Sequence, residues 1–291
     1  MTPPPMTPAS RVALHGDLLD FTADPGFAAP AGAPGVRYRP DHWLLVEDGR
    51  VAAVQPEAPD ASWQRVDHAG SLVLPGFIDT HVHSPQIDVI ASYGTELLEW
   101  LNTYTFPAER RFEDPAVATL GAERFLDGLL AHGTTSAVVF PTVHKHSAEA
   151  LFEGAQRRGM RLIAGKILMD RHAPDGLRDD VRQAERDCVD LIQRWHGRDR
   201  LAYALTVRFA PTSTSAQMHM AAALLQAHPG TYMQTHVAEN RDEVRWVGEL
   251  FPDARSYLDV YHRHKLLTER SVLAHGVWLD DTDRVLLRET G

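Results

Sequence analysis

Two histidines with a spacing suited to metal binding, His81 and His83, end a short apolar segment. In a β-strand, side chains at i and i+2 point to the same face, so both imidazoles can meet one metal ion. The same spacing also arises by chance in a chain with 16 histidines. The pair therefore indicates a metal site only if other ligands reach the same place.

Two other histidine pairs with this spacing serve as an internal control, His144 with His146 and His262 with His264. Both pairs fall in or beside stretches with a helical pattern. Residues i and i+2 diverge around a helix, so these pairs are poorly placed to share one ion. We expect all four of these side chains on the solvated surface.

Further histidines end later apolar segments. His236 ends the segment GTYMQTHVAE (230–239), and His275 lies near the end of SVLAHGVWL (271–279). In a barrel of parallel strands the carboxyl ends converge on one mouth, so three strands would bring four imidazoles together. Mixed histidine and carboxylate ligation with one position left open suits zinc, so we expect a Zn²⁺ site.

Glu239 lies three residues after His236, just beyond the expected strand. A carboxylate in this position can carry a proton beside a metal-activated water. The alternative is an acidic residue that interacts with the dipole of the following helix.

The chain between these residues alternates between apolar segments and helical patterns. The expected strands are SLVLPGFIDTHVH (71–83), GTTSAVVFPT (133–142), RLIAGKILM (161–169), LAYALTVRFAP (201–211), GTYMQTHVAE (230–239) and SVLAHGVWL (271–279). Strands alternating with helices predict an α/β fold with a parallel sheet. A closed (β/α)8 barrel of the TIM type needs eight such units, and six are visible, so we expect an incomplete barrel over residues 71–291.

The first 70 residues have a different character. Residues 1–10 are rich in proline and predict a disordered lead-in, and residues 11–70 predict a small N-terminal β-module. Within it, HWLLVEDGRVAAVQP reads as two strands joined by a turn at Asp48-Gly49, a strong hairpin signal.

Composition excludes several classes of protein. Lys plus Arg (29) minus Asp plus Glu (39) gives −10, which argues against a nucleic-acid partner. The single cysteine, Cys188, allows no disulfide within the chain. The sequence contains no apolar run of membrane-helix length and no secretory signal, so we expect no membrane partner and a cytoplasmic location.

The histidine pattern resembles the amidohydrolase superfamily, which carries His-x-His on the first barrel strand and one histidine on each of the fifth and sixth. His-x-x-Glu at the fifth strand resembles the metal-dependent deaminase branch, which uses one metal ion. A branch with two ions carries a carboxylated lysine at the end of the third or fourth strand. Here Lys166 lies inside the expected third strand, which favours one ion.

Longer blocks narrow the resemblance to the guanine deaminases. They are PGFIDTHVHSPQ (75–86), LLEWLNTYTFPAE (97–109), LMDRHAPD (168–175), RFAPTST (208–214), THVAENRDE (235–243) and YLDVYHRHKLLTERSVLAHGVWL (257–279). The blocks that contain TFPAE and RFAPTST are much more specific than His-x-His.

The resemblance implies a role for each matching residue. Zinc ligands would be His81, His83 and His236. His275 would contact the attacking water or the metal, and Glu239 would shuttle the proton. The guanine pocket would be formed by His236 together with Ser84, Pro85, Gln86, Arg208 and Phe209, of which Gln86 and Arg208 would hydrogen-bond the purine. For Arg208 the alternative is a surface ion pair.

The resemblance implies that the protein hydrolyses guanine to xanthine and ammonia. It also implies a homodimer. The family's last zinc ligand, an aspartate on the eighth strand, has no counterpart here, so we expect a fragment of a longer protein. Alternatives are a deaminase or dechlorinase of another heterocycle, an inactive fragment, and a non-catalytic barrel protein.

The segment LLEWLNTYTFPAE requires a separate interpretation. Leu97, Trp100, Leu101 and Tyr104 follow the spacing i, i+3, i+4, i+7, which predicts a helix with one apolar face. Most of these side chains are expected in the core, and a lid over the site is the alternative for part of the segment.

Overall fold

A computed structural model describes residues 11–26, 34–94 and 96–291 of the chain. The expected lead-in at residues 1–10 lies outside the described residues. Contacts between Cα atoms divide the chain into two compact units, Met1–Gly76 and Phe77–Gly291. Each unit is built around its own sheet.

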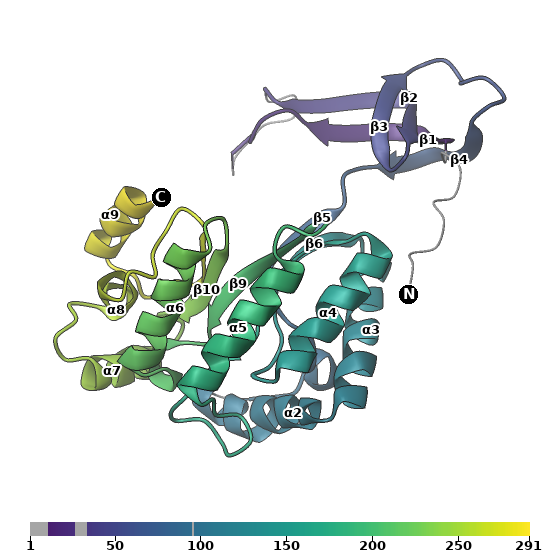
Figure 1. Ribbon diagram of the computed structural model, residues 1–291. Coiled ribbons are helices and arrows are strands. Elements are labelled where there is room, and N and C mark those ends of the chain that lie inside the picture. The colour runs from purple at the N-terminus through teal and green to yellow at the C-terminus, as the bar shows by residue number, and fades with distance from the viewer. Residues whose placement is uncertain (1–10, 27–33, 95) are drawn as a thin grey trace. The chain divides into compact units, whose positions relative to one another are not determined.

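The first unit holds a four-stranded sheet with the order β3-β2-β1-β4 (Figure 1). Its strands are β1 (Arg11–Phe21), β2 (Val36–Glu47), β3 (Arg50–Gln55) and β4 (Gln64–Val73). The predicted hairpin at Asp48-Gly49 is confirmed, because both residues have positive φ angles, 52° and 71°, as this kind of turn requires.

The end of the first unit differs from expectation. Residues 71–73 were expected to begin the first barrel strand, but Leu72 and Val73 continue β4 and pair with β1. The chain then passes through Pro75, which lacks the N–H group needed for a sheet ladder. The barrel strand β5 begins only at Phe77.

The second unit contains one parallel sheet with neighbours in sequence order. It comprises β5 (Phe77–His83), β6 (Thr134–Phe140), β7 (Arg161–Ala164), β9 (Leu201–Val207), β10 (Tyr232–Val237) and β11 (Ser271–His275), and the short β8 (Ile167–Leu168) pairs with β9. This order confirms the expected α/β barrel sheet with six strand positions. Phe77 and Ile78 of the edge strand β5 are 57% and 70% exposed.

The expected third strand is interrupted between β7 and β8. A Cβ atom on Gly165 would lie 1.8 Å from the carbonyl oxygen of Ala204, so only glycine allows this close approach to β9. Lys166 follows in the break, where its Nζ lies 2.5 Å from Oδ1 of Asp179. A lysine that is buried and paired in this way is not free to bridge two metal ions.

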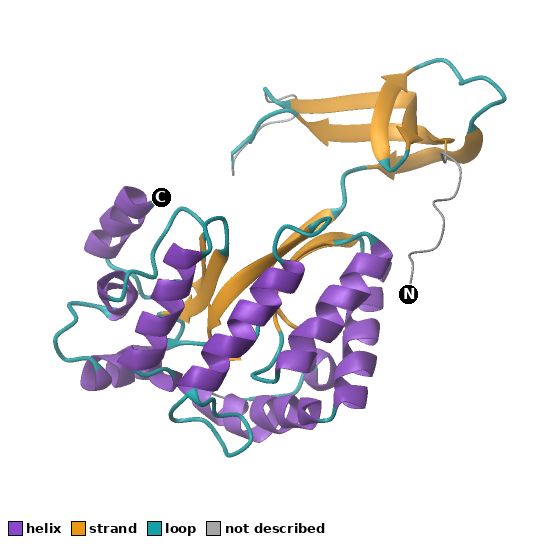
Figure 2. Ribbon diagram, viewed as in Figure 1, coloured by secondary structure: helices purple, strands orange, loops and turns teal. Residues whose placement is uncertain are grey.

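Helices connect the strands and cover the sheet (Figure 2). The main ones are α3 (Pro115–Ala131), α4 (Lys145–Arg158), α5 (Val181–Trp195), α6 (Ser215–Ala227), α7 (Arg241–Leu250), α8 (Tyr257–Arg263) and α9 (Asp281–Thr290). The predicted alternation of strands and helices is confirmed. Among the described residues, no helix has the length and apolar character needed to cross a membrane.

The control histidine pairs correct one expectation. His144 and His146 are only partly exposed, and Nε2 of His146 lies 2.7 Å from the carbonyl oxygen of Phe112. His264 is 8% exposed and contacts the carbonyl of Val260 at the end of α8. Only His262 is on the surface, because the first turn of α4 and the last turn of α8 both pack against neighbouring segments.

Candidate active site

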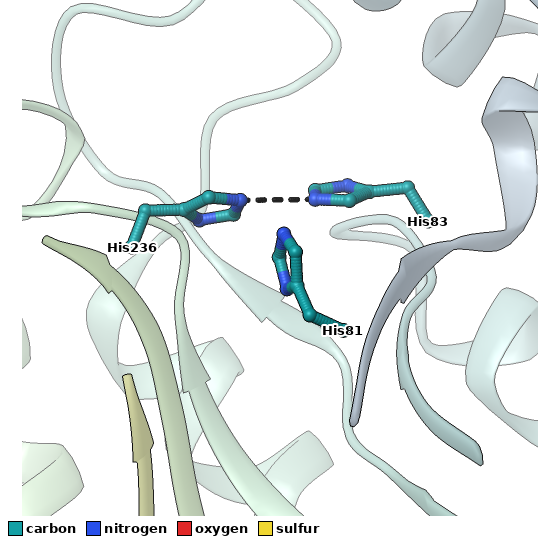
Figure 3. Close-up of side chains that lie close together, drawn as sticks. All are labelled: His81, His83 and His236. Atoms are coloured by element: carbon teal, nitrogen blue, oxygen red, sulfur yellow. Dashed lines mark hydrogen bonds between the residues drawn. The ribbon is translucent and has the colours of Figure 1, made fainter. Parts of the chain in front are cut away.

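Three histidines converge at the carboxyl ends of β5 and β10 (Figure 3). The potential ligand atoms of His81, His83 and His236 all lie within 4.8 Å of one another. Nε2 of His83 lies 3.0 Å from Nε2 of His236, and the ring of His81 points toward the gap between them. The structure thus brings together the three histidines predicted as ligands.

The protein surroundings prepare these imidazoles to bind a cation. The Nδ1 atom of His236 lies 2.6 Å from the carbonyl oxygen of Arg208 and donates its proton there, which leaves Nε2 with a free lone pair. The buried Nδ1 atoms of His81 and His83 have no hydrogen-bond partner within the described part of the chain. Asp79 accepts a bond from the backbone of His81 rather than from its ring.

Burial also keeps the histidines neutral. It lowers the pKa of His81 to about 4 and holds the pKa values of His83 and His236 well below the usual range. Neighbouring imidazoles and the Arg208 guanidinium act in the same direction. Neutral imidazole is the form that binds metal, so the three residues fit a metal ion at neutral pH.

The spacing of the nitrogens suits zinc. Two nitrogens bound to one tetrahedral Zn²⁺ at about 2.0–2.1 Å would lie about 3.3 Å apart. The 3.0 Å separation between His83 and His236 is close to that value. A small adjustment of the rings would allow both to bind the same ion.

A cavity of about 630 Å³ opens beside the histidines. This volume lies within the usual range for small-molecule sites. The wall includes every predicted site residue except Ser84 and Pro85. Its polar members are His81, His83, Gln86, His132, Arg208, His236, Glu239, Glu243 and His275. Groups that could hold a metal ion and groups that can form hydrogen bonds therefore face the same cavity.

Ser84 and Pro85 lie beside the cavity rather than in its wall. Both are buried in the first turn of a 3-10 helix, η1 (Ser84–Val89), and neither is among the residues that line the cavity. Gln86 and Ile87, which follow them in the chain, line the cavity.

Arg208, at the carboxyl end of β9, is 2% exposed, which excludes the surface ion pair. Its Nη1 lies 2.6 and 2.7 Å from the two carboxylate oxygens of Glu109, which is itself fully buried. The guanidinium also lies 5.2 Å from the ring centre of Phe106. These contacts fix a cation in the cavity wall.

Sequence reasoning missed Glu109 as a site residue, although it lies in the specific block TFPAE. Burial raises the pKa of this carboxyl, and the adjacent Arg208 opposes the rise. The sequence gives only a weak indication that Glu109 is buried: it lies three residues after Phe106, and so on the same face of the helical segment. Its partner lies 99 residues away in the chain.

Glu239 and His275 lie next to each other in the wall of the cavity. Nε2 of His275 lies 3.3 Å from Oε2 of Glu239, and the ring of His275 lies 5.1 Å from that of His81. Burial raises the pKa of Glu239 and lowers that of His275. A carboxylate with a raised pKa beside a metal-binding cluster can accept and return a proton.

Residues 97–110 form one helical segment on the apolar side of the cavity. It runs through α1 (Leu97–Trp100), a π-helical turn η2 (Leu101–Thr105) and α2 (Phe106–Arg110). The predicted helix is therefore confirmed. Leu97, Trp100 and Leu101 line the cavity, and the Trp100 indole donates to the carbonyl of Ser92 at 3.3 Å.

Replacing Trp100 tests whether this segment acts as a lid over the site. We expect Trp100→Ala to raise the KM for the substrate of this cavity about tenfold, equivalent to ~1.4 kcal/mol of lost binding. The reason is that the cavity loses the largest apolar side chain in its wall. Tyr104→Ala, on the same segment but not on the cavity wall, is the matched control. Unchanged KM and kcat in Trp100→Ala, with only thermal stability lost, would leave Trp100 as a packing residue.

Comparisons with known proteins agree with this geometry. The sequence profile described as the amidohydrolase family matches residues 72–291. A guanine deaminase of Escherichia coli (strain K12) is 46% identical over 287 residues, which cover 96% of this chain and 64% of that protein. The chain thus spans slightly less than two-thirds of the length of this relative.

Solved structures show the same similarity. The structure described as E. coli guanine deaminase has a TM-score of 0.90 and 43% sequence identity, covering 96% of this chain and 66% of that one. A guanine deaminase from C. acetobutylicum with bound guanine has a TM-score of 0.87 and 26% identity, covering 97% and 66%. With the family profile matching most of the chain and the three histidines in place, the chain belongs to the amidohydrolase family.

Proposed function

We propose that the protein containing this chain hydrolyses guanine to xanthine and ammonia, with one Zn²⁺ per subunit. The observation that carries the proposal is the single cavity that brings three neutral imidazoles together with Gln86, Arg208 and Glu239. Relatives described as guanine deaminases, one of them with guanine in its active site, support the choice of substrate.

His81, His83 and His236 would hold the metal. When bound, Zn²⁺ supplies a Lewis acid that lowers the pKa of water from 15.7 to about 7. The carbonyl of Arg208 keeps His236 in the orientation that this requires.

Two polar side chains would orient the purine. The Arg208 guanidinium, fixed by Glu109, donates hydrogen bonds to an acceptor such as the guanine carbonyl oxygen. The Gln86 amide both donates and accepts, which matches a ring edge that carries both kinds of group. Phe209 and Trp100 complete the apolar wall and limit access of water to the ring.

Glu239 would move the proton. Its carboxylate accepts a proton from the attacking water and delivers it to the purine, from which ammonia leaves after attack at C2. Burial favours this role, because the raised pKa of Glu239 makes the protonated form accessible during the reaction. Nε2 of His275 lies 3.3 Å from Oε2 of this carboxylate, close enough for His275 to orient it.

A series of substrates tests which heterocycle the site accepts. Guanine should be deaminated at least tenfold more efficiently than 2-aminopurine, which lacks the carbonyl acceptor for Arg208. Equal rates for the two purines, or preference for a triazine or pyrimidine, would assign the site to another heterocycle. A cytoplasmic location and a homodimer are parts of the same proposal, and the homodimer rests on the resemblance alone.

Metal binding can be tested without turnover. Zinc at 100 times its Kd should stabilise the metal-free protein by ~2.7 kcal/mol, because the ion binds only the folded site. His83→Ala should abolish this shift in melting temperature, whereas His262→Ala, at an exposed histidine, should retain it. An equal zinc shift in His83→Ala would place the ion elsewhere.

A further inference from the structure

The turn that carries Glu239 has an unfavourable backbone conformation. Ala238, between β10 and Glu239, has a φ of 49° and is 1% exposed. Residues other than glycine adopt this left-handed conformation only when the surroundings enforce it. The position of the Glu239 carboxylate therefore depends on whatever fixes this turn.

Hydrogen bonds fix the turn from two sides. The Trp278 amide donates to the carbonyl of Ala238 at 3.0 Å. On the other side, Oε2 of Glu243 accepts from the amides of both Glu239, at 2.9 Å, and Asn240, at 3.2 Å. One carboxylate oxygen thus holds two consecutive amides just after the left-handed residue.

Glu243 is itself held rigidly. Its side chain is fully buried, and Oε1 accepts a hydrogen bond from the Tyr257 hydroxyl at 2.7 Å. The ring of Tyr257 lies 5.7 Å from that of Tyr261, whose hydroxyl donates to the carbonyl of His236 at 2.8 Å. The carboxylate thus connects the Glu239 turn to α8, which also contacts the backbone of a metal-binding histidine.

Glu243 also forms the capping box of α7 with Asn240, a signal already present in the sequence Asn240-Arg241-Asp242-Glu243. An ordinary capping box needs no contact with a cavity, yet Glu243 belongs to the cavity wall. Both of its oxygens are occupied by protein donors. Because both oxygens already accept hydrogen bonds from the protein, Glu243 is suited to hold Glu239 in place rather than to exchange protons itself.

We propose that Glu243 is a positioning residue that fixes the Glu239 carboxylate for proton transfer. The kinetic part of the proposal rests on the proposed function, in which Glu239 moves the proton. The structural part, that Glu243 immobilises the turn, stands independently of any substrate.

Hydrogen exchange tests the structural part in the zinc-loaded protein. In Glu243→Ala, the amides of Glu239 and Asn240 should exchange at least about tenfold faster, because they lose their acceptor. Glu243→Gln keeps an acceptor oxygen and should retain most of the protection. Glu249→Ala, at an exposed position of α7, should change nothing. Unchanged exchange in Glu243→Ala would overturn the proposal.

Kinetics on guanine test the positioning role. Glu243→Ala should lower kcat at least about tenfold with little change in KM, and Glu243→Gln should recover most of that loss. In a Glu239→Gln background, Glu243→Ala should cause little further loss, because it acts through Glu239. The same loss in both backgrounds would contradict the proposal and leave Glu243 as a structural residue.

Failure of the proposed function can be distinguished from failure of the proposal for Glu243. A wild-type protein that binds zinc but does not turn over guanine would reject the proposed function, and the exchange measurement would still decide the role of Glu243. If Glu243→Ala does not fold, Tyr257→Phe carries the test, because it removes the donor that holds Oε1. Tyr257→Phe should speed exchange at Glu239 and Asn240 several-fold, and unchanged exchange would overturn the proposal.

Discussion

Replacing Glu239 with glutamine is expected to lower the turnover of guanine by about 10²- to 10⁴-fold, the range typical for loss of a general acid-base group. Glutamine has nearly the same shape but cannot accept and return a proton at neutral pH. The three histidines proposed as metal ligands are untouched, so zinc binding should be retained. The measurement is ammonia release under saturating guanine, with bound zinc determined on the same samples.

Two comparisons make this result specific. Glu269→Gln removes a carboxylate that is 81% exposed and should leave turnover unchanged. Loss of zinc together with turnover in Glu239→Gln would indicate a disturbed metal site. Retention of most turnover with zinc bound would remove Glu239 from the proton path.

Replacing Glu109 with alanine is expected to lower the free energy of unfolding by about 3–5 kcal/mol, the usual effect of removing one partner from a buried ion pair. The Arg208 guanidinium, only 2% exposed, would remain charged without its carboxylate. Because Arg208 lines the cavity, guanine binding should weaken as well. Denaturant unfolding and KM report these two effects separately.

Matched variants distinguish the ion pair from general packing. Replacing the pair with apolar residues, Glu109→Leu with Arg208→Met, should recover much of the lost stability, since no unpaired charge remains. Guanine binding should not recover in this double variant, because the Arg208 guanidinium is gone. Glu249→Ala, at an exposed glutamate, should stay within about 0.5 kcal/mol of wild type. A Glu109→Ala variant as stable as that control would show that the pair does not stabilise the fold.

The sequence predicted the architecture well because the barrel depends on local patterns. Short apolar segments alternating with helical patterns predicted the parallel sheet, and the ends of these segments predicted which histidines lie together. His81 and His83 illustrate why: the i, i+2 rule follows from strand geometry alone. His236 was predictable because the carboxyl ends of parallel strands converge.

Features that depend on tertiary contacts could not be predicted. The pairing of Glu109 with Arg208 joins residues far apart in the sequence, and no periodic pattern records it. The break at Gly165 depends on the backbone of the neighbouring strand. His264 was expected on the surface, yet the packing of α8 buries it. In each case the deciding contact comes from another element.

Ammonia release from guanine tests the central claim most directly. The protein would be stripped of metal and assayed before and after addition of one equivalent of Zn²⁺. We predict no activity in the metal-free protein and restored activity with zinc in the wild type but not in His83→Ala. Activity that is independent of zinc, or that survives in His83→Ala, would contradict a zinc-dependent guanine deaminase site at these histidines.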